Sequence, residues 1–166
     1  MTTITYFDNS DIPHYEEVRD EDMEVHSYED KPSVTEFNRD GSVYYQKWYN
    51  HGSLHRLLKP AFVLYYPSGK VRQQLWANNG VFSRGNVSLP YLIMYYSTGD
   101  VMSKRWVKTI DKLTYIKYYK TGVKMAELFQ NNNFLREFLP TGEIKSAKYL
   151  TKKYHISEDE NVSDSY

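Results

Sequence analysis

The chain has 166 residues, no cysteine and a formal net charge of zero, and 16% of its residues are aromatic. The lack of cysteine excludes disulfide frameworks, thiolate zinc sites and cysteine nucleophiles. Aromatic side chains favour strands over helices, and a mean hydropathy of −0.70 favours thin sheets over a thick aliphatic core.

Charge is strongly segregated along the chain. Residues 1–31 contain ten acids against Arg19 and Lys31, and the last thirteen residues contain four acids and no Lys or Arg. The segment 32–153 between them carries a net charge of +12. Two interpretations stay open: solvated acidic ends that keep a basic sheet soluble, or a basic body that meets an anionic partner.

This segregation predicts three parts. They are an acidic N-terminal arm over residues 1–35, a β-hairpin repeat domain over residues 36–150, and an acidic C-terminal tail over residues 151–166. No apolar run approaches the roughly 18–20 residues of a membrane span, so we expect no transmembrane segment. The first residues have neither the basic start nor the apolar stretch of a signal peptide, which favours a soluble, cytoplasmic protein.

The central segment contains a repeat built on five glycines. An aromatic residue lies four positions before each glycine, another lies seven positions after it, and four copies have a β-branched residue two positions after it. Three features on one frame in five copies are a strong repeat signal. The glycines are Gly41, Gly69, Gly99, Gly122 and Gly142, and the aromatic residues after them are Trp48, Trp76, Trp106, Phe129 and Tyr149.

Each copy is predicted to be a pair of short antiparallel strands with a turn at either end. The glycine follows turn-forming residues, as in Pro67-Ser68-Gly69, and can adopt a positive φ. A second turn is expected at Asn50-His51-Gly52 and at Asn78-Asn79-Gly80. Successive glycines are 28, 30, 23 and 20 residues apart, so the first copies have room for an extra strand or loop.

The predicted fold is therefore all-β: an elongated, largely single-layer antiparallel meander of about five hairpin repeats. The β-branched residue and the following aromatic residue are an odd number of positions apart, as Val43 and Trp48 are. Unless a bulge intervenes, they lie on opposite faces, and both faces carry aromatic ladders. Whether the sheet is open or closed stays undecided at this stage.

These motifs resemble the variant form of MORN (membrane occupation and recognition nexus) repeats. The likeness is greater to the Trp…Asn-Gly…His-Arg…Gly-Pro-Ala…Tyr-Tyr…Gly repeats of proteins from large (giant) DNA viruses, and similar variants occur in bacterial antitoxin-like proteins. It covers about residues 36–150. The third copy departs at Thr109-Ile110-Asp111, where Asn-x-Gly would stand, and the last two copies lack Trp. The residues that carry the likeness are Trp48-Tyr49-Asn50-His51-Gly52-Ser53-Leu54-His55-Arg56, Lys59-Pro60-Ala61-Phe62-Val63-Leu64-Tyr65-Tyr66, Arg84 and Pro90.

No residue pattern predicts catalysis, a cofactor or a metal. The five histidines lack metal-ligand spacing, since His51 and His55 flank a turn rather than sharing a helix face. The carboxylates of the central segment are few and scattered, and no serine lies in a nucleophile elbow. We therefore expect a protein that is not an enzyme and has no cofactor.

Three functions stay open. The resemblance implies a structural protein that docks other proteins, in a viral setting a virion component that contacts capsid proteins, located in the virion or host cytoplasm. The second is binding of nucleic acid or anionic lipid, through basic residues beside tyrosines. The third, from the bacterial resemblance alone, is an antitoxin-like inhibitor. Candidate anion contacts are Lys104, Arg105, Lys117 and Lys120.

Overall fold

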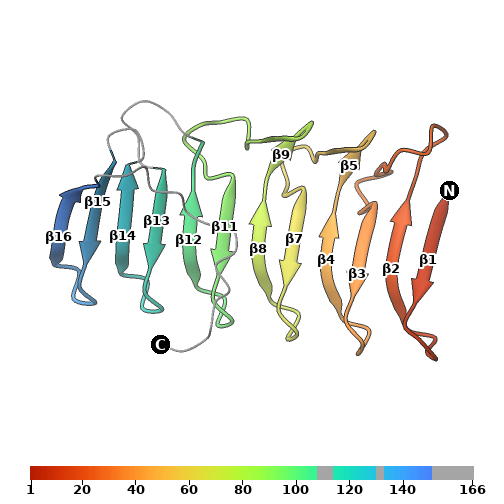
Figure 1. Cartoon of the computed structure of the whole chain (residues 1–166), viewed down its shortest axis with the longest axis horizontal. Coiled ribbons are helices and arrows are strands. Elements are labelled where there is room, and N and C mark those ends of the chain that lie inside the picture. The colour runs from red at the N-terminus through yellow and green to blue at the C-terminus, as the bar shows by residue number, and fades with distance from the viewer. Residues whose placement is uncertain (108–113, 130–132, 151–166) are drawn as a thin grey trace.

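The structure is a computed structural model that describes residues 1–107, 114–129 and 133–150. Within the described residues, twelve strands form one open antiparallel sheet, in which the strands follow one another in chain order and the small hairpins β5–β6 and β9–β10 are left out (Figure 1). In this part of the chain, no helix is long and apolar enough to cross a membrane. The sheet consists of β1 (Thr2–Tyr6), β2 (Pro13–Val18), β3 (Val34–Phe37), β4 (Val43–Lys47), β7 (Phe62–Tyr65), β8 (Val71–Leu75), β11 (Leu92–Tyr95), β12 (Val101–Arg105), β13 (Tyr115–Tyr118), β14 (Lys124–Phe129), β15 (Phe134–Phe138) and β16 (Ile144–Tyr149).

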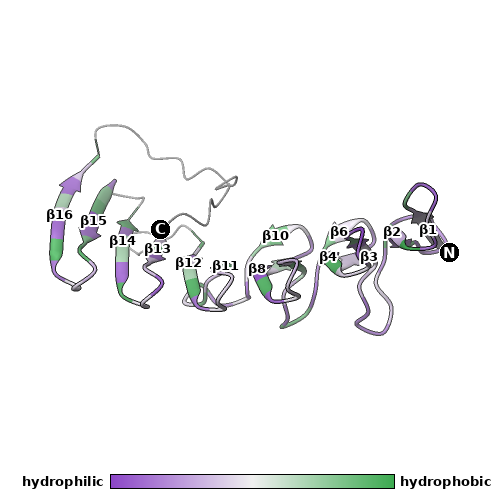
Figure 2. Ribbon diagram, turned by 90° about the horizontal axis from the view of Figure 1, so that it is seen from below, coloured by the Kyte–Doolittle hydropathy of each residue, from purple (hydrophilic) through white to green (hydrophobic). Residues whose placement is uncertain are grey.

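The all-β, single-layer meander expected from the repeat is confirmed. In the view of Figure 2 the sheet is one layer that runs from β1 to β16, with the small hairpins above the same side. Among the described residues the sheet is open, because β1 and β16 each pair with one neighbouring strand there. Their unpaired edges lie at opposite ends of the molecule (Figure 1).

All five repeat glycines occupy the same place in the fold. Each has a positive φ between 79° and 102° and lies in the tight turn between the two strands of a hairpin. The turns also share their hydrogen bonds: the Gly69 N–H donates to the Tyr66 carbonyl, and the Tyr66 N–H donates to the Lys70 carbonyl. The equivalent pair of bonds recurs at each of the other four glycines. These turns form the lower end of the sheet in Figure 1.

A β-bulge follows each glycine turn. In the first of these hairpins Glu36 pairs with Tyr45 and Phe37 pairs with Val43, so Tyr44 is an extra residue opposite Phe37. The same shift occurs in the other four hairpins. A bulge interrupts the alternation of side chains, and the prediction that Val43 and Trp48 lie on opposite faces therefore loses its premise.

The sheet begins before the boundary predicted at residue 36. The expected acidic arm contains β1 and β2, which form a sixth hairpin, and β2 pairs with β3. Its turn contains no glycine. Asn9 takes the positive φ of 57° instead, and the Ser10 N–H donates to the Phe7 carbonyl as in the glycine turns. Asparagine tolerates this conformation better than most residues. The predicted tail over 151–166 lies outside the described residues.

Two small hairpins form the extra elements expected in the longer copies. They are β5 (Tyr49–Asn50) with β6 (Ser53–Leu54), and β9 (Ala77–Asn78) with β10 (Val81–Phe82). The two central residues of each turn have positive φ, at 42° and 70° in the first and 47° and 78° in the second. This is the geometry of a two-residue hairpin turn that Asn-His-Gly and Asn-Asn-Gly predict.

Doubled tyrosines connect a hairpin to the hairpins before and after it. The first member bonds a glutamine of the preceding hairpin: Tyr65 donates to Gln46 Oε1 at 3.0 Å and Tyr95 donates to Gln74 Oε1 at 2.8 Å. Burial raises the pKa of Tyr65 and of Tyr95 further above neutral pH, where both hydroxyls are protonated donors. The second member donates to a carbonyl of the following hairpin, in the pairs Tyr66 to Tyr95, Tyr96 to Tyr118 and Tyr119 to Phe138.

We expect Tyr96→Phe to lower the free energy of unfolding by about 1 kcal/mol, the usual net value of a hydrogen bond. The Tyr96 hydroxyl lies 2.7 Å from the Tyr118 carbonyl, and its side chain is buried. Urea unfolding followed by far-UV circular dichroism measures the change. Tyr149→Phe is the matched control, because Tyr149 is 72% exposed, and it should change stability by less than about 0.5 kcal/mol. Equal effects of the two substitutions would contradict a ladder of hydroxyl bonds between hairpins.

Candidate interaction site

The strand ends opposite the glycine turns carry loops with charged and aromatic side chains. In the first of them Arg56 lies over the indole of Trp48, with its guanidinium carbon 3.8 Å from the ring centroid. Arg56 also bonds both carboxylate oxygens of Asp30, through Nε at 2.6 Å and Nη2 at 3.1 Å. Lys59 contacts the same carboxylate. We call Arg56 and Trp48 the first Arg–Trp pair.

Asp30 also supplies the acceptor for the indole. Trp48 Nε1 donates to the Asp30 backbone carbonyl at 2.9 Å. One residue therefore satisfies the arginine, 26 positions away, with its side chain and the tryptophan, 18 positions away, with its main chain. Asp30 has a positive φ of 60°, which aspartate tolerates better than most side chains.

The charge environment of Asp30 lowers its pKa. Hydrogen bonds from Arg56 and then Lys59 hold the pKa of this carboxyl well below its usual range, because both cations favour the ionised form. A folded-state pKa below the unfolded value stabilises the fold wherever the unfolded chain would be ionised. The contribution is complete well above pH 3.8, the unperturbed value, and is lost as the pH falls towards the folded-state pKa.

We expect Asp30→Asn to lower the free energy of unfolding by about 1 kcal/mol at pH 7, a modest value because the carboxylate is 45% exposed to solvent. Asparagine keeps the shape and tolerates the positive φ, so the loss reports the charge. The difference between the wild type and the variant should narrow as the pH falls from about 4 to about 2. Urea unfolding at a series of pH values measures it. A difference that stays constant with pH would contradict the ion-pair role.

Arg84 and Trp76 form a second Arg–Trp pair in the following copy. The Arg84 guanidinium carbon lies 3.9 Å from the Trp76 ring centroid, and each arginine follows its tryptophan by eight positions. Here the surroundings differ. Among the described residues Arg84 makes no ion pair, and Leu58 stands two positions before the loop proline, where the first pair has Asp30.

The indole N–H groups differ in the same way. Trp106 Nε1 donates to the Ser88 carbonyl at 3.0 Å, just as Trp48 does to the carbonyl of Asp30. Trp76 Nε1 is buried and has no hydrogen-bond partner within the described part of the chain. A buried donor without an acceptor is costly, so this N–H marks the second pair as the place where the repeat is incomplete.

Large apolar side chains are exposed around the second pair. Leu57 and Leu58 are 73% and 85% exposed on the loop before it. Monomeric proteins rarely expose such groups together without an interaction role. Further exposed apolar side chains lie on β10 and on the next loop: Val81, Phe82, Val87 and Leu89. We call this set of six residues the apolar edge; it lies at the upper end of the strands in Figure 1.

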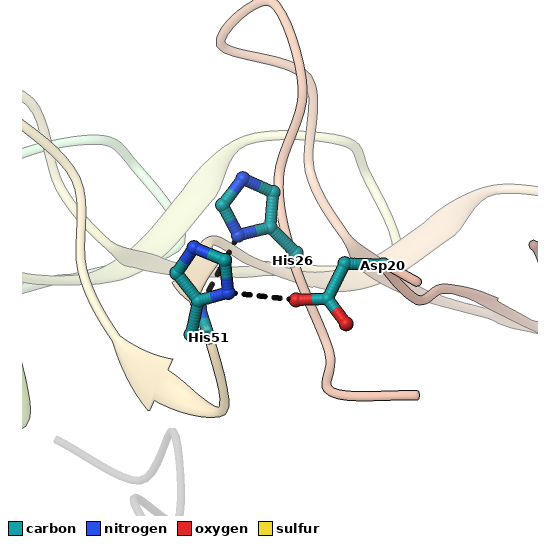
Figure 3. A group of neighbouring side chains, drawn as sticks. All are labelled: Asp20, His26 and His51. Atoms are coloured by element: carbon teal, nitrogen blue, oxygen red, sulfur yellow. Dashed lines mark hydrogen bonds and ion pairs between the residues drawn. The ribbon is translucent and has the colours of Figure 1, made fainter. Parts of the chain in front are cut away.

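A group of potential metal ligands lies at the same end of the sheet, beside the N-terminal hairpin. Asp20, His26 and His51 place their ligand atoms within 4.8 Å of one another (Figure 3). His51 Nδ1 is 2.8 Å from Asp20 Oδ2, and His26 Nδ1 accepts the His51 backbone N–H at 3.2 Å. Burial works to raise the pKa of Asp20, but hydrogen bonds from the Glu24 N–H, His51 and the Asp22 N–H lower it below its ordinary value.

The same contacts account for this group without a metal. His55 Nδ1 accepts the Asn79 N–H at 3.2 Å, just as His26 accepts the N–H of His51 one copy earlier. These histidines therefore connect successive small hairpins. Asp20 Oδ1 already accepts two backbone N–H groups. A metal at this group would have to displace internal hydrogen bonds. Sequence spacing did not predict the group, because its members lie 6 and 25 positions apart and meet only through the stacking of copies.

The predicted anion contacts do not form one cluster. Arg105 pairs with Tyr115 and Lys117 with Ser103, which places both basic residues on one face of the sheet, whereas Lys104 pairs with Ile116 on the other face. Lys120 lies in a glycine turn, with Nζ 5.8 Å from the Tyr96 ring centroid. Lys104, Arg105 and Lys120 each lie near one tyrosine ring, and cations of this kind are common on exposed strands.

The predicted repeat aromatics do occupy equivalent positions. Trp48, Trp76 and Trp106 each directly follow a strand, at the upper end of the sheet. Phe129 and Tyr149 take the corresponding places in the last two copies, where both contact Phe134, with ring centroids 6.1 Å and 5.1 Å apart. The stacked arginine is specific to the pairs at Trp48 and Trp76 among the described residues. The shared spacing of eight residues was the sequence signal for it.

Comparison with known proteins gave no relative: no family model, no curated protein and no solved structure matches the chain.

Proposed function

We propose that the chain is a non-enzymatic interaction protein whose repeat sheet is a docking scaffold for other proteins. The observation that carries the proposal is the apolar edge, where large apolar side chains are exposed on successive loops of one end of the sheet. The hollow beside β1 and β2, of about 400 Å³, is lined by Glu16 and Lys31 as its charged groups and by uncharged side chains otherwise. That lining offers no convergent set of acids and bases.

The sheet suits such a role because its hairpins are rigidly spaced. Each hairpin bonds the next through backbone pairs and, in several copies, through tyrosine hydroxyls. Apolar side chains on a fixed scaffold lose little conformational freedom when a partner covers them, which favours binding. The resemblance to repeat proteins of large DNA viruses extends the proposal to a capsid-associated component of a virion.

The test compares partner capture by the wild type and by a variant in which Val81, Phe82, Val87 and Leu89 are all serine. Quantitative affinity purification from cells of the native source, and from purified particles where they exist, should show partners that the wild type retains and the variant loses. The control variant changes exposed apolar residues at the glycine-turn end, Tyr44→Ser, Leu139→Ser and Ile144→Ser. It should retain the partners. Equal capture by both variants would contradict the proposal, and far-UV circular dichroism verifies that each is folded.

A further inference from the structure

The first Arg–Trp pair shows what completes such a pair in this fold. The Asp30 carboxylate takes two hydrogen bonds from Arg56, and the carbonyl of the same residue takes the indole N–H of Trp48. A bidentate contact between arginine and a carboxylate is directional and is strengthened by the charges of both partners. The group that this pair binds is thus an aspartate carried on a loop.

The second pair has the same two donors, an arginine and an indole N–H, but no aspartate beside them. Arg84 lies on Trp76 as Arg56 lies on Trp48, at 3.9 Å and 3.8 Å from the ring centroids. Arg84 is half-buried and makes no ion pair among the described residues, and Trp76 is 6% exposed with an indole N–H that lacks an acceptor there. In the first pair only the arginine uses the carboxylate, because the indole N–H of Trp48, like that of Trp106, bonds a backbone carbonyl. The arginine of the second pair is therefore the group that lacks an acidic partner.

The loop beside the second pair has the backbone conformation that Asp30 adopts in the first, but it carries no acidic side chain there. Leu58 has a φ of 62°, nearly equal to the 60° of Asp30. Leucine is disfavoured in this region of φ, whereas aspartate is enriched there. Leu58 instead presents an apolar side chain that is 85% exposed, beside Leu57. The loop thus replaces an internal carboxylate with an apolar contact surface.

We infer that Arg84, together with Trp76 and the exposed Leu57 and Leu58, forms a site for an acidic side chain of a protein partner. This inference rests on the proposed docking function and adds the chemistry of the partner. The partner supplies an aspartate or glutamate carboxylate to the Arg84 guanidinium and an adjacent apolar side chain to the two leucines. Charge complementarity selects this occupant, because Arg84 makes no ion pair among the described residues and the neighbouring loop exposes two leucines.

The probe is a blocked peptide that copies residues 27–33, acetyl-Ser-Tyr-Glu-Asp-Lys-Pro-Ser-amide, the segment that completes the first pair internally. It is titrated into the full chain, labelled with ¹⁵N, at low salt. The chain has three tryptophans, so three indole N–H signals report the three sites separately. We expect a saturable shift of the Trp76 signal, with a Kd of about 1 mM for so short a peptide. The Trp48 and Trp106 signals should stay in place.

Two variants and one altered peptide decide between specific and general binding. Arg84→Gln should weaken the peptide about tenfold or more, because it removes the cation and keeps a polar side chain. Leu58→Asp should place a carboxylate beside Arg84 within the chain, move the Trp76 signal of the free protein in the same direction as the peptide does, and abolish the response to the peptide. The peptide with Asn in place of the Asp should bind about tenfold more weakly.

Three outcomes would overturn the inference. They are no shift of the Trp76 signal up to about 10 mM peptide, equal shifts of all three indole signals, and equal shifts with the Asp and Asn peptides. The docking function is separable from it. If Arg84→Gln captures the same partners as the wild type while the serine variant of the apolar edge loses them, the docking function is supported and the proposed acidic ligand of Arg84 is contradicted.

Discussion

Replacing Leu128 by alanine is expected to lower the free energy of unfolding by about 3 kcal/mol, in the range measured for buried leucines. Leu128 is 1% exposed, in a sheet where few apolar side chains are fully covered. It pairs with Tyr115 on one side and with Leu135 on the other. Its carbonyl accepts both the N–H and the hydroxyl of Thr114. Alanine keeps those backbone bonds, so the loss reports the packing of the side chain.

Urea unfolding followed by far-UV circular dichroism measures the effect of Leu128→Ala, and hydrogen exchange locates it. In a repeat array each copy contacts only its neighbours, so the faster exchange should be concentrated in β13, β14 and β15. Leu57→Ala removes the same atoms from a side chain that is 73% exposed, and it should change stability by less than about 0.5 kcal/mol. Similar losses for the two variants would show that the sheet gains little from covering Leu128.

Trp48→Ala should lower the free energy of unfolding by about 4 kcal/mol, which is within the range for buried aromatic residues. The substitution removes a side chain that is 5% exposed, the platform under Arg56, and the N–H that bonds the Asp30 carbonyl. It also leaves the ion pair of Arg56 and Asp30 without support on one side. Far-UV circular dichroism during urea unfolding measures the change.

Trp48→Phe and Trp76→Phe separate the indole hydrogen bond from the packing. Both remove one ring and one N–H from a side chain that is about equally buried. The N–H of Trp48 has an acceptor and that of Trp76 has none in the described residues. Trp48→Phe should therefore cost about 1 kcal/mol more than Trp76→Phe. If Trp76→Phe lowers the free energy of unfolding by as much as Trp48→Phe or more, the indole hydrogen bond of Trp48 adds no stability over the unpaired N–H of Trp76.

The repeat frame predicted most of the sheet, because turn geometry is a local property. Glycine at a position that requires a positive φ, with aromatic residues at fixed distances, specifies a hairpin without reference to the rest of the chain. The N-terminal hairpin escaped prediction for the same reason. Its turn has no glycine and takes its positive φ at Asn9, and the acidic residues of this segment suggested a solvated arm.

The candidate site was less predictable, because its contacts join separate copies. Arg56 belonged to the repeat pattern, but its partner Asp30 lies 26 positions earlier, in the segment assigned to the arm. Leu58 is seen to take the place of Asp30 only when the loops that contain Pro32 and Pro60 are aligned. The sequence did not suggest that alignment, because the segment before residue 36 was assigned to the arm. The bulges were equally hidden, since an extra residue opposite one partner is defined by pairing and not by composition.

The regular pairing of β1 through β16 also gives the molecule a built-in length scale. Neighbouring strands lie about 4.8 Å apart, so equivalent residues of successive hairpins recur at intervals of about 10 Å along the sheet. The two Arg–Trp pairs are one such interval apart. A partner that engages more than one hairpin must match this pitch, and inserting or deleting a whole copy would shift its contacts by a full step while leaving each local geometry unchanged.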